Sequence, residues 1–433
     1  MIRTVQVITL GCSKNTVDTE HLLAALPPDR FRVIPEGEDA AVDYLLVNTC
    51  GFIGDAKEES VNAVLAAGQR RRDGLAGKLF VFGCLSQRYP DELPSLIPEV
   101  DGWFGARDLA PVLKALGVAD SERQDRFRPV QGRPYAFLKI SEGCDRRCSY
   151  CAIPLIRGNH RSVPMETLEK EARELAEGGV RELVIIAQDT TWYGLDLYGR
   201  RALAELLRRL SAIPGIEWLR LHYSYPAQFP DDVLEEMASN PKVCPYLDIP
   251  LQHISDRVLG NMHRGVNGEW TRSLISRLRE KVPGVVLRTT VMVGHPGEGT
   301  QEFRQLLDFV REARFERLGA FAYSEEEGTW GAGHLRDSVR ESTKQERLGR
   351  LMNLQREISL EFNRSRIGSE ERVLVDDWTD GVLVCRSRYE SPEVDGEILV
   401  KCEDEALARS LVGNFARVRI TAADEYDLTA DLL

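Results

Sequence analysis

The sequence lacks any run of about 18 apolar residues, which is the length that a helix needs to cross a bilayer. Its start, MIRTVQVITLGC, holds one Arg and a short apolar stretch but no small-residue cleavage site. This pattern predicts a first β-strand and not a signal peptide. We therefore expect a cytoplasmic protein with no membrane partner.

Several catalytic signatures are also absent. The sequence has no Walker loop, no Gly-x-Ser-x-Gly elbow and no His-Glu-x-x-His pair, which excludes the enzyme classes that depend on these motifs. The histidines are scattered, and most are expected to be structural or exposed. They are His21, His160, His222, His253, His263, His295 and His334.

An excess of positive charge is missing too. The chain has 56 Lys and Arg against 68 Asp and Glu, a formal net charge of −12. An acidic chain repels nucleic acid unless it carries a local basic patch. The triplet Arg70–Arg72 is more typical of a solvated helix face than of such a patch. Direct nucleic-acid binding is therefore not expected, and a basic protein or a small molecule is the favoured partner.

What the chain does contain is an alternation of strand and helix patterns, repeated in two series. A length of 433 residues favours two or three domains. Residues 1–118 predict a doubly wound parallel-sheet domain, and the charged segment 119–134 predicts a linker. The expected strands of this domain are Val5–Leu10, Tyr44–Val47 and Leu79–Phe82, and the expected helices are Thr16–Leu26 and Ala56–Arg72.

The second series, residues 135–368, predicts a partial (β/α) barrel. Six strand patterns alternate with helical ones: Ala136–Ile140, Leu183–Ala187, Trp218–Tyr223, Tyr246–Leu251, Val285–Val293 and Leu318–Tyr323. The clearest helix is Met165–Glu177, with Ser162 and Pro164 at its start and two glycines at its end. A long helix is expected over Thr343–Arg366.

The last stretch, residues 369–433, changes character and predicts a small all-β barrel. Turn residues such as Asp380–Gly381 and Asp395–Gly396 separate its short strand patterns. These patterns are Arg372–Val375, Val382–Arg386, Ile398–Lys401 and Ala416–Ile420. The predicted fold class of the whole chain is therefore α/β, with a small all-β barrel at its C-terminal end.

Three of the nine cysteines share one loop, SEGCDRRCSYCAIP. Cys144, Cys148 and Cys151 have a spacing that lets three thiolates surround one cubane, whereas an ordinary ferredoxin cluster takes four cysteines. Three ligands leave one iron open, as catalytic metal sites do. The alternative is a zinc site with His160 as the fourth ligand. A disulfide framework is not expected from an odd number of cysteines in a reducing compartment.

A second set, Cys12, Cys50 and Cys84, is spread over 72 residues, but each member follows a predicted strand. The carboxyl ends of parallel strands meet at one edge of a sheet, so these cysteines can converge and hold a second cluster with an open iron. The alternative is that they are buried structural residues. Cys244, Cys385 and Cys402 match no motif and are expected to be small core residues.

The loop of Cys144, Cys148 and Cys151, together with the βα series around it, resembles the radical S-adenosylmethionine (SAM) superfamily. The segments GCSKNTVDTE, NTCGFIGDAKEES and GCLSQRY resemble the N-terminal domain of the methylthiotransferases in that superfamily. The resemblance implies a [4Fe–4S] cluster on each cysteine set. One cluster binds and cleaves SAM to a 5′-deoxyadenosyl radical, and a sulfur species at the auxiliary cluster supplies the transferred group.

The same resemblance implies contacts to SAM, at residues that also have ordinary structural explanations. Polar strand ends, a glycine turn, an aromatic ring and an arginine make up this set of candidates: Tyr150, Gln188, Asp189, Arg288, Gly294 and Gly297. For Arg288 the alternative is an ordinary ion pair. His295 and Gly299 replace the Phe and Thr that are usual in this glycine motif, so the roles of those two side chains are open.

Three segments resemble the branch of the family that modifies an aspartate β-carbon of the twelfth small-subunit ribosomal protein. They are QDTTWYGLDLYG, IPLQHISDRVLGNMHRG and SRYESPEVDG. In this family the C-terminal barrel is a TRAM domain. Here residues 369–433 hold 7 Arg and Lys against 16 Asp and Glu, which favours a basic protein over phosphates. The alternative is that the barrel is only a structural cap.

The resemblance further implies a second SAM as methyl source and an electron donor such as flavodoxin or ferredoxin. Arg157 and Arg161 are candidates for gripping the target aspartate. Two other functions stay open. One is methylthiolation of an adenosine in transfer RNA by the other branch of the family. The other is an iron–sulfur electron-transfer or carrier protein, although such a protein would call for four-cysteine clusters.

Overall fold

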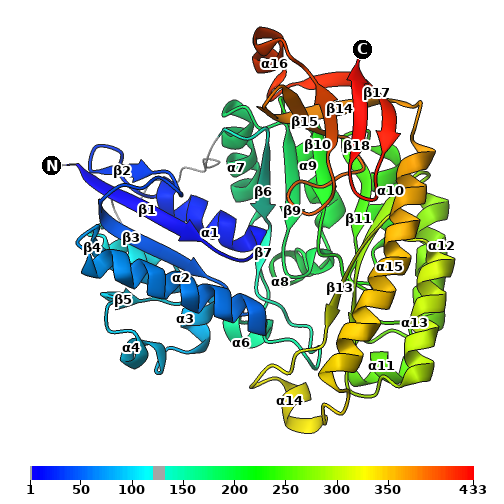
Figure 1. The fold of residues 1–433 in the computed structure, drawn as a ribbon, viewed down its shortest axis with the longest axis horizontal. Helices are drawn as coiled ribbons and strands as arrows, with labels where there is room; N and C mark the ends of the chain where they lie inside the picture. The colour runs from blue at the N-terminus through cyan, green and yellow to red at the C-terminus, as the bar shows by residue number, and fades with distance from the viewer. Residues whose placement is uncertain (1, 120–131) are drawn as a thin grey trace.

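The computed structural model describes residues 2–119 and 132–433. Most of the predicted linker, 119–134, lies outside the described residues, and the predicted domain limits stay predictions. The described chain forms a five-stranded sheet, a six-stranded sheet and a closed five-stranded barrel, which confirms the predicted fold class (Figure 1). No helix in this part of the chain combines the length and the hydropathy that a membrane span requires.

The N-terminal sheet is parallel throughout and has the strand order β2-β1-β3-β4-β5. Its apolar side chains pack on one face against α1 and α5, and on the other face against α2, so the sheet is covered on both sides. The strands are β1 Arg3–Thr9, β2 Phe31–Ile34, β3 Val42–Thr49, β4 Ala76–Gly83 and β5 Gly102–Trp103. The helices are α1 Ser13–Ala24, α2 Gly54–Arg72, α3 Cys84–Arg88, α4 Leu93–Leu96 and α5 Ala110–Ala115.

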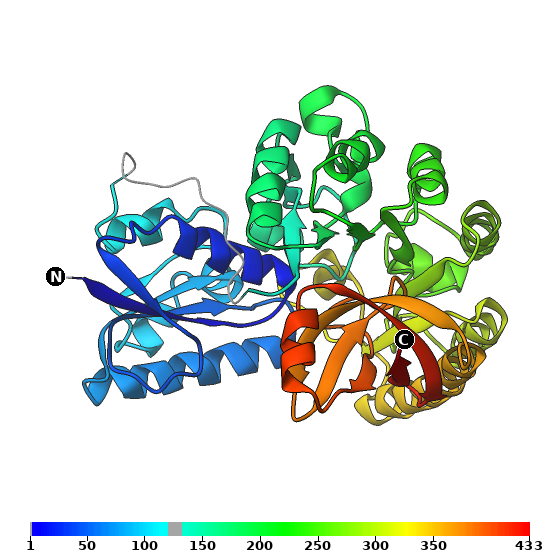
Figure 2. The same ribbon diagram turned by 90° about the horizontal axis from the view of Figure 1, so that it is seen from above.

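The six-stranded sheet is a partial barrel of parallel strands in the order β6-β9-β10-β11-β12-β13. All six predicted strands are present: β6 Tyr135–Lys139, β9 Glu182–Ile186, β10 Trp218–Leu221, β11 Val243–Asp248, β12 Val286–Val293 and β13 Arg317–Ala322. Its longer helices lie on the outside, as Figure 2 shows. They are α7 Met165–Glu177, α9 Leu203–Ser211, α10 Asp231–Ser239, α12 Gly268–Lys281, α13 Thr300–Ala313 and α15 Glu341–Ser365.

Short elements complete the partial barrel: β7 Ser141–Glu142, α6 Ile153–Arg157, β8 Arg161–Ser162, η2 Thr190–Trp192, α8 Leu195–Tyr198, α11 Asp256–Asn261 and α14 Trp330–His334. The helix predicted over Met165–Glu177 has these limits in the structure, but Ser162 does not cap it. The Ser162 hydroxyl donates instead to Asp196, at 2.6 Å. The partial barrel is open along β6, and Val17 of α1 packs there against Phe137 and Val184.

The C-terminal barrel closes in the order β14-β15-β16-β18-β17. Its elements are β14 Glu370–Thr379, β15 Val382–Arg386, β16 Ile398–Lys401, α16 Glu405–Leu411, β17 Phe415–Ala423 and β18 Leu428–Leu432. It sits over the end of the partial barrel at which the strands begin (Figures 1 and 2). There the Phe415 ring lies 4.8 Å from the ring of Trp218, the first residue of β10. We call this end the floor of the partial barrel and the opposite end the mouth.

Candidate active site

All six motif cysteines line one cavity of about 340 Å³ at the mouth of the partial barrel. Cys12 precedes α1, Cys50 follows β3 and Cys84 begins α3, so each follows the carboxyl end of a parallel strand of the N-terminal sheet. The other three cysteines lie in the loop between β7 and α6. Because α1 packs on the open edge of the partial barrel, the two sets face the same space.

Glycines beside the cysteines let these loops approach closely. Gly11 has φ +96°, and a Cβ atom on it would lie 2.7 Å from the Cβ of Cys50. Gly83 has φ +108°, and a Cβ on it would lie 2.6 Å from the Thr49 carbonyl oxygen. Both positions need a backbone conformation that other residues rarely adopt. The Gly-Cys pairs therefore serve the convergence of the strand ends.

Burial favours the protonated form of several thiols of the cavity in the metal-free protein. Burial raises the pKa of Cys50 and of Cys144 to about 12. Burial also raises the pKa of Cys84, although the Arg157 guanidinium opposes the shift. Thiolate ligation by a metal must displace these protons, so assembly of the site is expected to be coupled to proton release.

The arrangement of the cysteines suits a cluster better than a single ion. Among residues 2–119 and 132–433, no three His, Cys, Asp or Glu side chains come close enough to share one metal ion. The thiols around a cubane are farther apart than the ligands of one tetrahedral zinc, because each binds a different iron. His160, the fourth ligand in the alternative zinc site, does not line the cavity of the cysteines, and its Nε2 lies 3.1 Å from the Ser162 hydroxyl.

Arginines stack on an aromatic ring beside Cys148. The guanidinium carbons of Arg146 and Arg264 lie 4.0 Å and 4.3 Å from the centroid of the Tyr225 ring. Arg264 also donates to the Cys148 sulfur at 3.4 Å and to the Tyr150 hydroxyl at 3.3 Å. Arg146 pairs with Asp189 at 2.8 Å. Positive charge close to a cysteine sulfur stabilises its thiolate form.

Two of the six predicted SAM contacts, Tyr150 and Gln188, line this cavity, and the other four do not. The Oε1 atom of Gln188 is buried and has no hydrogen-bond partner among the described residues. Asp189 is held by Arg146 and accepts from the Thr191 backbone N–H at 2.9 Å. Arg288 forms the ion pair that was the alternative to a contact with SAM: its guanidinium lies 3.4 Å from Asp248 and 3.5 Å from Asp395.

The predicted glycine turn is shaped by packing within the protein. A Cβ on Gly294, at φ +78°, would lie 2.4 Å from the Lys344 Cγ. A Cβ on Gly297, at φ +96°, would lie 2.4 Å from the Asn261 Nδ2. Both atoms belong to neighbouring helices, α15 and α11, so these glycines admit side chains of the protein at the end of β12. This packing is an ordinary structural reason for the two glycines, and their contact with SAM stays a prediction.

Arg157 is not free to bind a substrate. It donates to Asp18 at 2.7 Å, to the Asn15 side chain at 2.6 Å and to the Cys84 sulfur at 3.3 Å. Its side chain thus joins the partial barrel to the N-terminal domain. Arg161 is exposed on β8 and does not line the cavity.

Sequence reasoning missed several residues of the cavity wall: Lys14, Tyr223, Gln252, Arg264 and Thr290. Tyr223 and Gln252 have positive φ angles, 57° and 72°, which are uncommon for residues other than glycine and cluster at functional sites. Three of them had a signal in the sequence, because Lys14 lies in GCSKNTVDTE and Gln252 and Arg264 lie in IPLQHISDRVLGNMHRG, two of the segments that resemble the family. Tyr223 follows β10 and Thr290 lies in β12, and neither belongs to a recognisable motif.

Family models match most of the chain. The radical SAM superfamily matches residues 138–310, the uncharacterized protein family UPF0004 matches residues 4–105, and the TRAM domain matches residues 367–433. The first model covers the loop of Cys144, Cys148 and Cys151, and the second covers Cys12, Cys50 and Cys84.

The chain is similar over its full length to proteins named ribosomal protein uS12 methylthiotransferase RimO. The protein from Porphyromonas gingivalis is 50% identical over 99% of both chains. The protein from Bacteroides fragilis is 47% identical over 100% of this chain and 99% of its own. The one from Flavobacterium psychrophilum is 48% identical over 98% and 96%.

Solved structures share the fold at much lower identity. The radical SAM methyltransferase TsrM from Kitasatospora setae has a TM-score of 0.55 at 16% identity, covering 74% of this chain and 75% of its own. The cobalamin-dependent radical SAM enzyme OxsB has a TM-score of 0.53 at 14% identity, covering 82% and 56%. At such identities these likenesses concern the fold alone.

Proposed function

The chain belongs to the family of ribosomal protein uS12 methylthiotransferases, and from this premise we propose that it attaches a methylthio group to an aspartate β-carbon of that ribosomal protein. The observation that carries the proposal is the single cavity lined by all six motif cysteines. A reaction that removes a hydrogen at one cofactor and adds sulfur from another needs both beside the same substrate atom.

The side chains fit two [4Fe–4S] clusters and SAM. We assign one cluster to Cys144, Cys148 and Cys151 and the auxiliary cluster to Cys12, Cys50 and Cys84. When bound, the clusters and SAM supply the radical that activates the β-carbon, and the sulfur and methyl group that are attached to it. The unpartnered Oε1 of Gln188 is a suitable acceptor for the amino group of SAM.

The residues of the chain hold the two cysteine sets at a fixed separation. Arg157, Lys139 and Asp18 form a buried ionic network between the partial barrel and α1. Arg264 places a cation beside Cys148, and Tyr150 fills the space next to it. Apolar side chains, Phe52 and Ile153 among them, line the same cavity and keep water from the reacting carbon.

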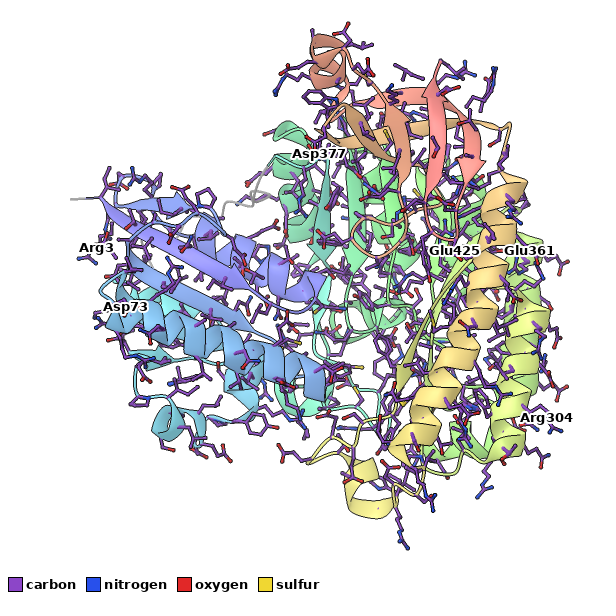
Figure 3. The ribbon with its side chains drawn as sticks, viewed as in Figure 1. Arg3, Asp73, Arg304, Glu361, Asp377 and Glu425 are labelled. Carbon is purple, nitrogen blue, oxygen red and sulfur yellow. The ribbon has the colours of Figure 1, made fainter. Side chains whose placement is uncertain are left out.

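A ribosomal protein as substrate agrees with the acidity of the C-terminal barrel, but the structure reduces the weight of that charge. Asp395 and Glu390 pair with Arg288 and Arg317 of the partial barrel and are buried. Exposed acids such as Asp377 and Glu425 remain on the barrel surface (Figure 3). The acidic surface lies at the floor, whereas the cavity opens at the mouth. A substrate bound in the cavity therefore contacts the acidic surface only if it runs along the side of the molecule.

The proposed substrate implies a cytoplasmic location, and the chemistry requires an electron donor such as flavodoxin or ferredoxin.

The test is mass spectrometry of uS12 and of transfer RNA from cells with and without the gene. We expect its loss to remove a methylthio mass from one uS12 aspartate and to leave transfer RNA unchanged. Loss of a methylthio group from an adenosine, with uS12 unaltered, would refute the substrate and keep only the cluster chemistry. A gene that restores the modification only when all six cysteines are intact would link the modification to the cavity.

A further inference from the structure

Lys14 is a cation in the cavity wall that forms no ion pair with a carboxylate of the described residues. It belongs to the first turn of α1, two residues after Cys12, and its relative exposure is 8%. No carboxylate lies within 4.0 Å of its Nζ among the residues that the structure describes, and no hydrogen bond from Nζ is formed there. Nζ lies instead 2.9 Å from the centroid of the Tyr223 ring. A buried ammonium without a counter-ion is costly, so its partner is expected to arrive with a ligand.

Other cations near the cavity already have partners. Arg157 and Lys139 share Asp18, and Arg146 pairs with Asp189. The N–H groups of Arg264 are directed to the Cys148 sulfur, the Tyr150 hydroxyl and the Pro250 carbonyl oxygen. Lys14 therefore differs from Arg157, Lys139 and Arg146 in having no carboxylate within ion-pair distance. It differs from Arg264, which also lacks a carboxylate, in that none of its Nζ donors is hydrogen-bonded to another described residue.

The position of Lys14 favours the substrate as that ligand. It enters the cavity from the N-terminal domain, which carries Cys12, while Tyr223 enters from the partial barrel beside Ser224 and Tyr225. The Tyr223 backbone is fixed at φ 57° by its N–H, which donates to Asp248 at 3.1 Å. The aromatic face thus holds the ammonium at the boundary between the two cysteine sets. In aspartate the β-carbon is bonded directly to the side-chain carboxylate. A β-carbon that reacts between the two cysteine sets therefore brings this carboxylate into the space next to Lys14.

We propose that Lys14 is the specificity-determining residue that binds the side-chain carboxylate of the target aspartate. The inference rests on the proposed function and adds to it the group that recognises the substrate. A charge-assisted hydrogen bond in a water-poor cavity selects a carboxylate over a neutral side chain or a nucleic-acid base. Tyr223 positions the ammonium and is not itself expected to contact the substrate carboxylate.

Binding of two synthetic peptides to the protein with both clusters reconstituted tests this role. One peptide spans the target aspartate of uS12, and the other has Asn at that position. We expect the wild-type protein to bind the Asp peptide about tenfold or more tightly than the Asn peptide. Lys14→Gln should bring the ratio to about one to two, and Lys14→Arg should keep most of it. Lys78→Gln, an exposed lysine of the same domain, is the matched control and should keep the full ratio.

Each other outcome overturns a defined part of the argument. If Lys14→Gln keeps the wild-type ratio at unchanged iron content, Lys14 does not bind the carboxylate. If the variant loses about half of its iron, Lys14 serves the auxiliary cluster, and the inference is wrong. If the wild-type protein binds the Asp peptide and modifies it but does not discriminate against Asn, only the inference fails. If the wild-type protein neither binds nor modifies the Asp peptide, the proposed function fails first.

Discussion

Buried charges are paired with one another at the floor of the partial barrel, whereas some at the mouth have no ion-pair partner among the described residues. At the floor, buried arginines are matched by carboxylates: Glu182 lies between Arg220 and Arg386, at 2.6 Å and 2.7 Å. Glu390 likewise accepts from both Arg317 and Arg366. At the mouth, Lys14 and Arg264 have no carboxylate partner among the described residues.

This difference separates structural charge from functional charge. The paired floor charges satisfy one another and fix the segment 387–396, one of the three that resemble the ribosomal-protein branch, against the partial barrel. His222 at the end of β10 reaches Ser391 of that segment at 2.7 Å, and Tyr246 reaches Asp395 at 2.6 Å. The unpaired mouth charges line the cavity that we propose for SAM and the substrate carboxylate. Charge left unmatched in a well-paired protein therefore marks its ligand site.

The largest effect is expected from a cysteine at the mouth compared with one at the floor. Cys148→Ala removes a ligand of the SAM-cleaving cluster, and we expect it to abolish activity and to lower bound iron by about half. Cys244→Ala changes a fully buried cysteine packed near Trp218 and Tyr246, and should leave the iron content unchanged. Iron analysis of both reconstituted variants checks this. Equal iron loss in the two variants would contradict the assignment of the clusters.

Breaking a floor ion pair should cost the most stability. Glu390→Ala leaves Arg317 and Arg366 buried near one another without their shared carboxylate. We expect a loss of about 3–5 kcal/mol in the free energy of unfolding. Glu370→Ala removes an exposed carboxylate that pairs with Arg417 and Arg419, and should cost far less stability because solvent screens the pair. Urea unfolding of the metal-free variants measures both values, and similar losses would show that burial does not set the difference.

As the pH falls, the stability contributed by His295 at the mouth should be lost before the stability contributed by Glu390 at the floor. Burial lowers the pKa of His295, which follows β12 at the mouth, from 6.5 to about 4. In the unfolded chain His295 binds a proton more readily than in the folded protein. The stability that depends on neutral His295 is therefore complete above pH 6.5 and is lost as the pH falls towards 4. Arg366 and Arg317 lower the pKa of Glu390 from 4.5 to about 2 against the effect of burial, so its contribution is lost only between those values.

The His295 part of this pH dependence can be isolated with a variant. His295→Asn should flatten the decline in stability between pH 6.5 and 4, by roughly 1–3 kcal/mol, and leave the decline below pH 4 in place. Thermal unfolding of the metal-free protein across this range is the measurement. A decline that is unchanged in the variant would assign the titration to other groups.

The smallest expected effect concerns Lys14 itself. In the metal-free protein, Lys14→Met replaces an unpaired buried cation by an apolar side chain of similar length. We expect stability to stay within about 1 kcal/mol of the wild type or to rise, because no buried partner is left behind. Urea unfolding beside the Glu390→Ala variant makes the comparison direct. A loss of several kcal/mol would mean that Lys14 has a structural partner and would remove the contrast between the two ends.

The sequence by itself determined the identity of the six cysteines, their division into two sets and the fold class. These features depend on local patterns. One cysteine set has a characteristic spacing within one loop, and each cysteine of the other set follows a predicted strand. Apolar periodicity predicts each long strand or helix from its own residues. The strands β2, β5, β7, β8 and β18 were not predicted. Three of them, β5, β7 and β8, have only two residues, whereas β2 pairs with the distant strand β1 and β18 closes the barrel between β16 and β17.

Only the tertiary structure decided which side chains meet. It brought Cys12 and Cys148 to one cavity, directed Arg288 to Asp395 and engaged Arg157 with Asp18, across separations of about one hundred residues or more. It also left Lys14 without an ion-pair partner in the part of the chain that the structure describes. No spacing rule predicts such contacts, because they depend on how α1 packs against the partial barrel and how segment 387–396 fills its floor. The cysteine motifs that indicate the chemistry are visible in the sequence, whereas the pairing of charges depends on tertiary packing.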